Sequence, residues 1–336
     1  MGPLRQPAHH RFRIADEADA GALRRMAAGC ADRLGAAPAA RARVELVATE
    51  LATNLVRHAK PGGWVLVRPV APDGLEFLAV DHGPGIPDLA AALDGCSPAP
   101  GGLGRGLAAV RRACVLFDIE TGPGRGTIVL SRVDLGDGSA RGRPDRGGVS
   151  VGVMETCGDG WAVADVAEGL AVAVVDGLGH GVKASVAADA ALDAFAADPA
   201  DLHGLLGRAN AAMRATRGAA MTACLLEPGR GELHYVAVGN VSGRVLAGPD
   251  ERGLALSAGT LGLKPAPPRT RVLSHPWRPG ATLVLWTDGL NSRLDLSARA
   301  DLLSHDPAVV AAALHRDHAR ERDDATVVVI RHPENR

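Results

Sequence analysis

The stretch LAVAVVDGLGHG, residues 170–181, joins a run of apolar residues to an aspartate and three glycines. The apolar run predicts a buried strand over Leu170–Val175, with Asp176 at its end. A carboxylate in that position is costly unless it is paired or binds a cation. His180, four residues later, has no second histidine at ligand spacing, so we interpret it as a structural or supporting residue. The stretch therefore indicates a carboxylate placed where a metal ion could neutralise it.

Other aspartates of the second half repeat this arrangement. Asp288 follows the apolar run Leu283–Trp286, Asp323 precedes the run Thr326–Ile330, and Asp159 is a further acidic candidate. Taken singly, each aspartate fits a helix N-cap or a turn. Converging carboxylates are the ligands that Mg²⁺ and Mn²⁺ prefer, and two such ions can generate hydroxide and hold a phosphoryl group.

The remainder of the second half has short β-rich runs and a few helical stretches. Helices are expected at residues 180–197, 199–216 and 307–319. Many short strands around a pair of adjacent helices favour an α+β sandwich over a doubly wound parallel sheet.

Residues 148–332 resemble the SpoIIE-like branch of the metal-dependent type 2C serine/threonine phosphatases. The resemblance rests on these aspartates and on the sequences Ala220–Ala223 and Gly259–Gly262. The resemblance implies an α/β-sandwich with a metal-binding centre. It implies that Asp176, the carbonyl of Gly177, Asp288 and Asp323 bind metal ions, and that the three aspartates are also catalytic. It implies Asp159 as a further metal ligand, although the local pattern around Asp159 departs from the fuller G-G-D-x-x-D of longer relatives. No phosphate-binding arginine is evident near the start of this segment.

The stretch DLGDGSARGRPDRG, residues 134–147, has one leucine as its only large apolar residue. Glycine, proline and charge of this kind predict a linker, because such a segment cannot bury a core. We therefore expect two domains, at residues 10–133 and 148–332.

Three short motifs occur in order in the first half. Glu50 and Asn54 are four residues apart on an expected helix over Pro38–Ala59, so they share one face. Asp81 follows a strand-like run and stands next to Gly83 and Gly85, which permit a close backbone approach to a flat ring. The third motif is a glycine-rich loop before a helix, where backbone N–H groups favour anions; its glycines include Gly102, Gly104 and Gly106. Taken alone, these motifs also fit a solvated helix face, an ordinary turn and a flexible connection.

In this order the motifs resemble the N, G1 and G2 boxes of the GHKL ATPase superfamily, and most of all its anti-sigma and switch serine kinases. The resemblance covers roughly residues 10–133 and implies a Bergerat-type α/β sandwich that binds ATP. It implies that Glu50 activates the nucleophile, Asn54 ligates Mg²⁺ and Asp81 binds the adenine amine. The residues implied to surround the nucleotide are Gly83, Gly85, Gly102, Gly104, Gly106 and Thr127.

Composition excludes several classes of function. The formal net charge is −1 and aromatic residues make up 3% of the chain, which argues against binding of nucleic acid. The longest apolar stretch, Gly169–Val175, is far short of a membrane span, and no secretory signal is visible. The five cysteines are scattered, so we expect a reduced, cytoplasmic protein without disulfides.

A kinase-like ATPase and a phosphatase in one chain predict opposing control of one phosphoserine or phosphothreonine switch. By resemblance, the partner is a STAS-domain antagonist or a stressosome protein, with a sigma factor as a further candidate and a homodimer as a possible assembly. The alternative is a nucleotide-gated module that binds a partner, fused to a phosphatase that ATP regulates.

Overall fold

The computed structural model describes residues 4–332 except for 95–102, 137–144, 249, 292–293, 295, 297–298 and 300. The chain divides into two compact units: residues 9–144 form one, and residues 1–8 with 145–336 form the other. We call them the N-terminal and the C-terminal unit and describe each by itself.

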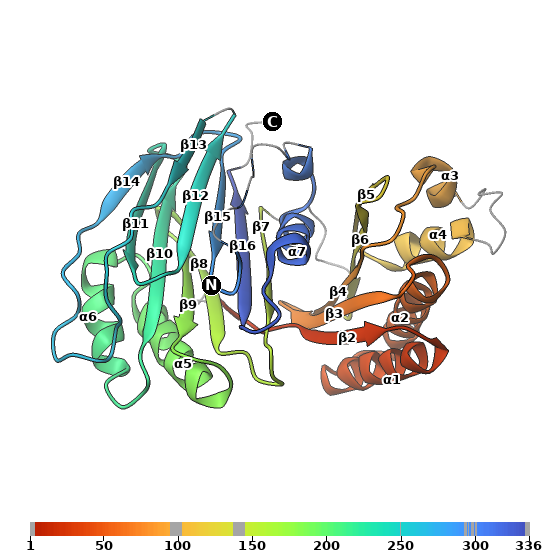
Figure 1. Ribbon diagram of the computed structural model, residues 1–336, viewed down its shortest axis with the longest axis horizontal. Helices are drawn as coiled ribbons and strands as arrows, with labels where there is room; N and C mark the ends of the chain where they lie inside the picture. The colour runs from red at the N-terminus through yellow and green to blue at the C-terminus, as the bar shows by residue number, and fades with distance from the viewer. Residues whose placement is uncertain are drawn as a thin grey trace. The chain divides into compact units, whose positions relative to one another are not determined.

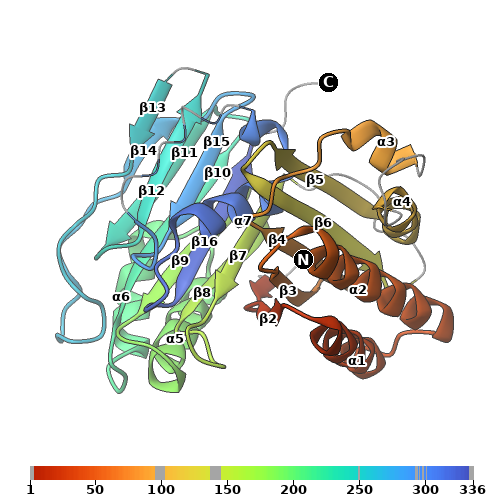
Figure 2. The same ribbon diagram turned by 45° about the vertical axis from the view of Figure 1, so that its right-hand side comes forward.

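The N-terminal unit is an antiparallel sheet covered on one face by helices (Figure 2). Its strands lie in the order β2-β3-β4-β6-β5. In chain order its elements are β2 (His10–Ile14), α1 (Glu17–Arg33), α2 (Pro38–His58), β3 (Gly63–Val70), β4 (Gly74–Asp81), α3 (Leu89–Asp94), α4 (Leu103–Ala113), β5 (Leu116–Gly122) and β6 (Gly126–Asp134).

Local sequence explains where the first two helices begin. Asp16 caps α1 and forms a capping box with Asp19, which satisfies backbone N–H groups that the first turn leaves open. Pro38 stands in the first turn of α2, where a missing N–H costs nothing. The apolar side of α2, including Val47 and Leu51, packs into the core under the sheet. This packing fixes the helix that carries Glu50 and Asn54.

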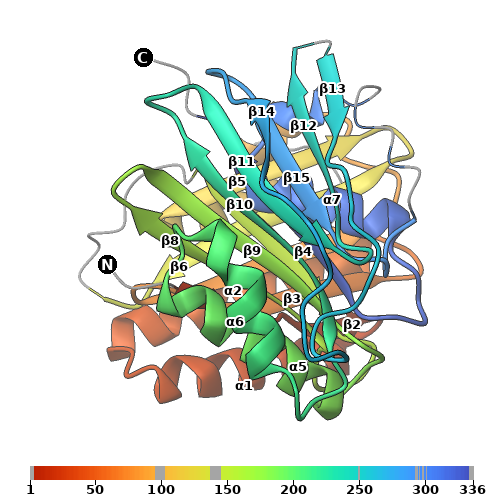
Figure 3. The ribbon, with the colours of Figure 1, turned by 90° about the vertical axis from the view of Figure 1, so that its left-hand side faces the viewer.

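The C-terminal unit has two antiparallel sheets packed between helices, as Figures 1 and 3 show. Strand order is β1-β8-β9-β10-β11-β14 in the first sheet and β13-β12-β15-β16-β7 in the second. Its elements are β1 (Leu4–Gln6), β7 (Arg146–Val151), β8 (Asp159–Val166), β9 (Gly169–Gly177), α5 (Val182–Ala197), α6 (Leu202–Ala212), β10 (Ala219–Glu227), β11 (Glu232–Val238), β12 (Ser242–Ala247), β13 (Asp250–Gly253), β14 (Leu273–Pro276), β15 (Thr282–Trp286), a 3₁₀ turn (Leu302–Ser304), α7 (Pro307–His318) and β16 (Ala325–Arg331).

Side chains that point alternately to the two faces of each strand form the cores of this unit. Ala173 and Val175 of β9 point to the core beneath α5 and α6, while Val172 and Val174 point to the core between the two sheets. Helix α7 covers the outer face of the second sheet at β7 and β16. The strands are therefore buried on both faces, which explains why β9 is a continuous apolar run.

Strand β1 lies far in sequence from the sheet that it joins. Leu4, Arg5 and Gln6 pair with β8, and Arg5 forms ion pairs with Asp189 and Asp193 of α5. The chain thus crosses between the two units twice, near residues 8–9 and near 144–145.

The segment expected as a linker, residues 134–147, takes part in strands at both ends. β6 runs to Asp134, and β7 begins at Arg146, with Gly147 opposite Val329 of β16. A Cβ on Gly147 would overlap the backbone of α7 at Ala308, so this glycine permits close packing of a helix on a strand. No helix in the described part of the chain has the length and apolarity to cross a membrane.

Candidate functional site: a carboxylate centre and a nucleotide site

The structure brings together the four aspartates of the C-terminal unit that the sequence singled out. Asp176 ends β9, and Asp159 begins β8 directly opposite it in the sheet. Asp288 follows β15, and Asp323 precedes β16. The charges of Asp159, Asp288 and Asp323 all act on Asp176, so carboxylates from both sheets meet at one end of the sandwich.

Burial and mutual repulsion make this cluster electrostatically costly. Burial, followed by the charges of the neighbouring carboxylates, raises the pKa of Asp176 to about 9. Burial also raises the pKa of Asp159, to about 7, and that of Asp323. The described residues do not supply enough positive charge to neutralise these groups, and a divalent cation would relieve this repulsion.

One buried atom points to a cation in the same way. Oδ2 of Asp176 is buried and has no hydrogen-bond partner within the described residues. A buried acceptor left without a donor costs free energy, and a metal ion would satisfy it. The residues present therefore fit Mg²⁺ or Mn²⁺, both of which take oxygen ligands.

Gly177, the other residue expected at this centre, lies where a side chain has no room. A Cβ there would overlap the carbonyl oxygen of Ala184 in α5, and the N–H of Gly177 donates to the carbonyl of Gly158 at 3.2 Å. Glycine therefore lets the end of β9 pass close against the start of α5.

Two polar residues that sequence reasoning did not assign hold the carboxylates in place. Thr287 Oγ1 donates to Asp159 Oδ2 at 2.7 Å and accepts the N–H of Thr326 at 3.0 Å. Asn240 Nδ2 donates to Asp288 Oδ2 at 2.5 Å. Thr287 directly follows β15 and Asn240 lies two residues after the end of β11, but nothing in the sequence marks either one as a donor to an aspartate.

Asp324 has a structural function beside the cluster. It is 2% exposed, and its two carboxylate oxygens accept the N–H groups of Val153 and Gly158 at 2.8 and 2.5 Å. The side chain therefore anchors the loop between β7 and β8, while its backbone N–H donates to Asp323 at 3.0 Å.

In the N-terminal unit, Glu50 and Asn54 lie one turn apart on α2 and face α4. A Cβ on Gly106 of α4 would lie 2.5 Å from Glu50 Oε2 and 3.6 Å from Asn54 Oδ1. Asn54 Nδ2 is buried and has no hydrogen-bond partner in the described part of the chain. The absence of a side chain at Gly106 thus lets α4 pack close against the polar face of α2.

Asp81 is fixed at the end of β4 by backbone donors. Its Oδ1 accepts the N–H of Gly83 at 2.7 Å and that of Thr127 at 3.2 Å. Thr127 Oγ1 lies 3.0 Å from Thr121 Oγ1 on the neighbouring strand. These contacts bring together the expected adenine-binding residues from β4 and β6.

The loop after β4 is pressed against the turn between β5 and β6. Gly85 has φ +81°, and a Cβ there would overlap the carbonyl of Gly122. The N–H of Gly124 donates to the carbonyl of Pro84 at 3.0 Å. Gly104 lies in α4, whereas Gly102 falls outside the described residues.

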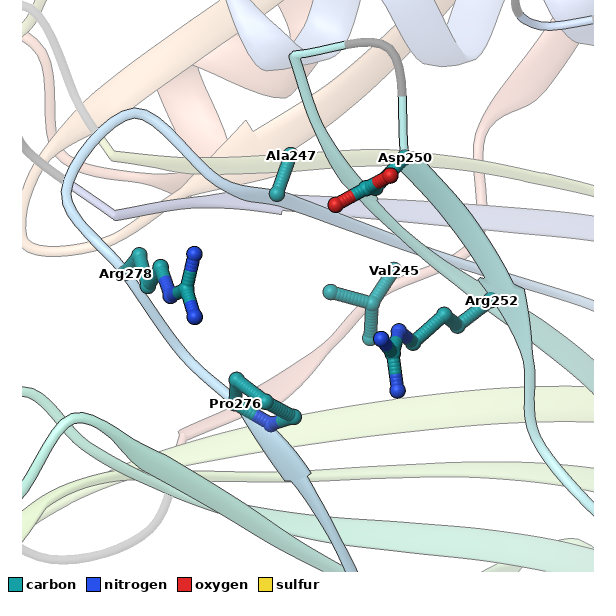
Figure 4. Close-up of a pocket in the computed structure, with 6 residues that line it drawn as sticks. All are labelled: Val245, Ala247, Asp250, Arg252, Pro276 and Arg278. Carbon is teal, nitrogen blue, oxygen red and sulfur yellow. The ribbon is translucent and has the colours of Figure 1, made fainter.

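Figure 4 shows a pocket in the C-terminal unit. Its lining includes Val245 and Ala247 of β12, with Arg252 and Arg278 beside them. Ser242, at the opposite end of β12, pairs with Trp286 shortly before Asp288. The pocket is therefore separate from the carboxylate centre.

Comparison with known proteins gives two family matches on this one chain. Residues 14–132 match the histidine kinase-like ATPase domain, and residues 167–333 match stage II sporulation protein E (SpoIIE). The resemblances to a GHKL ATPase and to a SpoIIE-like type 2C phosphatase are thereby confirmed, together with the two-domain α+β class.

Individual relatives agree with this division. The serine/threonine-protein kinase RsbT of Bacillus subtilis (strain 168) is 35% identical over 119 residues, which are 35% of this chain and 90% of RsbT. A solved chain of the bacterial stressosome is 23% identical, covers 55% of this chain and 97% of its own length, and has a TM-score of 0.50. RsbX in complex with magnesium is 22% identical, with 55% and 92% covered and a TM-score of 0.47. The chain therefore belongs to the histidine kinase-like ATPase family of RsbT, with a SpoIIE-type phosphatase domain fused behind it.

Proposed function

We propose that this chain is a bifunctional regulator of a partner-switching pathway. Its N-terminal unit phosphorylates a serine or threonine of a partner protein with Mg-ATP, and its C-terminal unit removes such a phosphate. The observation that carries the proposal is the meeting of four aspartates from β8, β9, β15 and β16, one of them with a buried, unpaired carboxylate oxygen. The similarity of the other unit to the serine/threonine kinase RsbT supports the opposing activity.

In the phosphatase reaction, Asp176, the carbonyl of Gly177, Asp288 and Asp323 would hold two divalent cations, with Asp159 as a neighbouring acidic ligand. When bound, such ions neutralise the phosphate and lower the pKa of water, which supplies a nucleophile at neutral pH. Thr287 keeps Asp159 oriented by its hydrogen bond, and Asn240 does the same for Asp288. Mg²⁺ and Mn²⁺ both suit these oxygen ligands.

In the kinase reaction, Glu50 would take the proton of the attacking hydroxyl, and Asn54 would ligate Mg²⁺. Asp81 would accept a hydrogen bond from the adenine amine, with Thr127 beside it and Gly83 and Gly85 against the base. Gly102, with Gly104 and Gly106 in the first turn of α4, would cover the phosphates, where N–H groups at a helix start attract anions.

The partner that this pair of activities fits is a STAS-domain antagonist or stressosome protein with a phosphorylated serine or threonine. We place this cycle in the cytoplasm, where ATP is available. A sigma factor is a further candidate partner of the N-terminal unit.

The test offers the purified full-length chain two substrates. With radiolabelled ATP and Mg²⁺, we expect label to pass to a STAS-domain protein, and Glu50→Gln should abolish this transfer. With Mn²⁺ and the phosphorylated STAS protein, we expect release of phosphate, and Asp176→Asn should abolish it. Each variant leaves the other site intact and serves as its control, so full activity in Asp176→Asn would overturn the proposed metal site.

A second candidate function is a phosphatase that ATP regulates, with little phosphate transfer. The observation that favours it is the course of the chain, because β1 belongs to the phosphatase sheet and leads directly into β2 of the ATPase sheet. A change in the ATPase unit on nucleotide binding could act on β8 through this connection. A non-hydrolysable ATP analogue would change the phosphatase rate of the wild type but not of Asn54→Ala; equal rates with and without the analogue would refute it.

A further inference from the structure

Six large apolar side chains around the carboxylate centre are left in solvent. They come from the β7–β8 loop, the loop after β9, the first two turns of α5 and the segment after β13, and they are Val153 (40% exposed), Met154 (56%), Leu178 (50%), Val182 (66%), Val186 (51%) and Leu263 (53%). We call this set the apolar rim. Isolated apolar residues on a surface need no explanation, but a contiguous set marks an interaction site.

Contacts between these segments place the residues of the rim side by side. Met154 lies against the start of α5, because its sulfur is 3.4 Å from the position of a Cβ on Gly181. The N–H of Leu178 donates to the carbonyl of Gly218 at 2.9 Å, and a Cβ on Gly218 would lie 3.4 Å from Leu263. The rim thus extends from the β7–β8 loop across the start of α5 and the loop after β9 to Leu263.

The fold does not need these side chains for its core. On α5 the inward positions are small and buried, such as Ala184, Ala187 and Ala188, and they pack beneath the helix. Val182 and Val186 are four residues apart on the opposite, solvent-facing side. β-branched residues lower helix propensity, so this face has no local structural reason to carry two valines.

Positive charge stands beside the rim. A Cβ on Gly179 would lie 3.0 Å from Nη1 of Arg217, so the guanidinium lies next to the loop that follows β9. Arg217 is exposed, and no carboxylate of the described residues forms an ion pair with it. Lys183, on the first turn of α5, is also exposed. A surface with apolar contacts and cations without partners complements a protein surface that carries a phosphate.

We propose that the apolar rim is the docking surface for the folded phosphoprotein on which the carboxylate centre acts. This inference rests on the proposed phosphatase function and specifies how its substrate is selected. The rim borders the carboxylate centre, because Leu178 lies two residues after Asp176 and the N–H of Val153 donates to Asp324, so a partner seated on it would present its phosphate at Asp176. Small phosphate esters make no use of the rim, and the protein context of the phosphate therefore determines specificity.

The experiment compares three substrates of the full-length chain with Mn²⁺: a serine-phosphorylated STAS-domain protein, a phosphoserine peptide copied from it, and p-nitrophenyl phosphate. The variant is the double substitution Val182→Glu and Val186→Glu. Its matched control is Leu34→Glu with Leu46→Glu, two apolar residues of the N-terminal unit that are 47% and 40% exposed.

We expect the rim variant to lose about tenfold or more in kcat/KM for the phosphoprotein, with the peptide and p-nitrophenyl phosphate within about twofold of wild type. Unchanged turnover of p-nitrophenyl phosphate shows that the variant is folded. An equal loss on all three substrates, or no loss on the phosphoprotein, would overturn the docking surface. If the wild type cleaves p-nitrophenyl phosphate but not the phosphoprotein, the partner class and the docking surface are both wrong. If it cleaves none of the three, the proposed phosphatase function itself fails.

Discussion

Replacing Asp176 by asparagine should stabilise the metal-free protein although it removes a residue of the proposed active site. The pKa of this carboxyl is raised from its ordinary value of 3.8 to about 9 by burial and by the neighbouring carboxylates. A carboxyl with a raised pKa binds its proton more tightly in the folded state than in the unfolded state. Between pH 4 and 9 the unfolded state therefore binds fewer protons, so the free energy of unfolding falls as the pH rises.

The magnitude follows from the pH interval over which the two states differ. One pKa unit corresponds to 1.36 kcal/mol, so the interval from 3.8 to pH 7.5 sets a ceiling of about 5 kcal/mol. Solvent reaches part of the side chain, which reduces the expected gain in Asp176→Asn to about 2 kcal/mol. For a unit of this size, 2 kcal/mol raises the melting temperature by about 4–8 °C.

The assay is thermal unfolding in a chelator at pH 4.5, 6 and 7.5, followed by the same series with Mn²⁺. We expect the variant's advantage to grow with pH in the chelator and to reverse with Mn²⁺, because only the wild type binds the ions and gains stability from them. Asp250→Asn, at an exposed position of β13, is the control and should change nothing. A melting temperature below that of the wild type in chelator at pH 7.5 would refute the reasoning.

Three further substitutions test other parts of the fold. Burial would raise the pKa of Glu76, but the ion pairs with Arg68 and Arg132 and the nearby His9 hold this pKa well below 4.5. Glu76→Gln should therefore lower the free energy of unfolding, measured in urea at pH 7, by about 3–5 kcal/mol. That difference should shrink only below pH 4.5, and a constant difference at lower pH would contradict it. Gly106→Ala should displace Glu50 and lower the rate of ATP hydrolysis about tenfold. The control is Gly207→Ala, also within a helix but with open space around it, which should leave the rate unchanged. Equal effects of the two substitutions would contradict the steric argument. Asp324→Asn should speed amide exchange in the β7–β8 loop and cost about 1–3 kcal/mol, because one of the two N–H groups loses its acceptor; unchanged exchange would count against the anchoring role.

Much of this fold could be predicted from local patterns. The apolar run before Asp176 forms β9, as its composition predicts. The aspartates that adjoin apolar runs do come together, because in each case the strand end is fixed by core packing on both faces. Periodicity and position on a strand were sufficient for these elements.

Other features depend on contacts that no local pattern records. Strand β1 has three residues and owes its place to β8 and to the ion pairs of Arg5, all distant in sequence. Gly147 lies in a stretch of glycine and charged residues that predicts a linker. In the structure Gly147 pairs with β16, and its lack of a side chain lets α7 pack closely on the strand. Thr287 and Asn240 are recognisable as supports only when their partners are known.

The two sites are shaped by different physical effects, and this difference bears on how each can be controlled. The carboxylate centre gathers like charges at the end of a buried sandwich, so its ligands cost stability until a cation neutralises them. At the proposed nucleotide site, Gly85 and Gly106 permit close packing of neighbouring segments, and Asp81 is already held by backbone N–H groups. A cation at the proposed metal site would therefore stabilise the C-terminal unit, whereas a nucleotide at the proposed site would meet groups that the fold already holds in place. With both proposed sites in one chain, cation and nucleotide would act through separate free-energy terms, as the proposed opposing control of one phosphate requires.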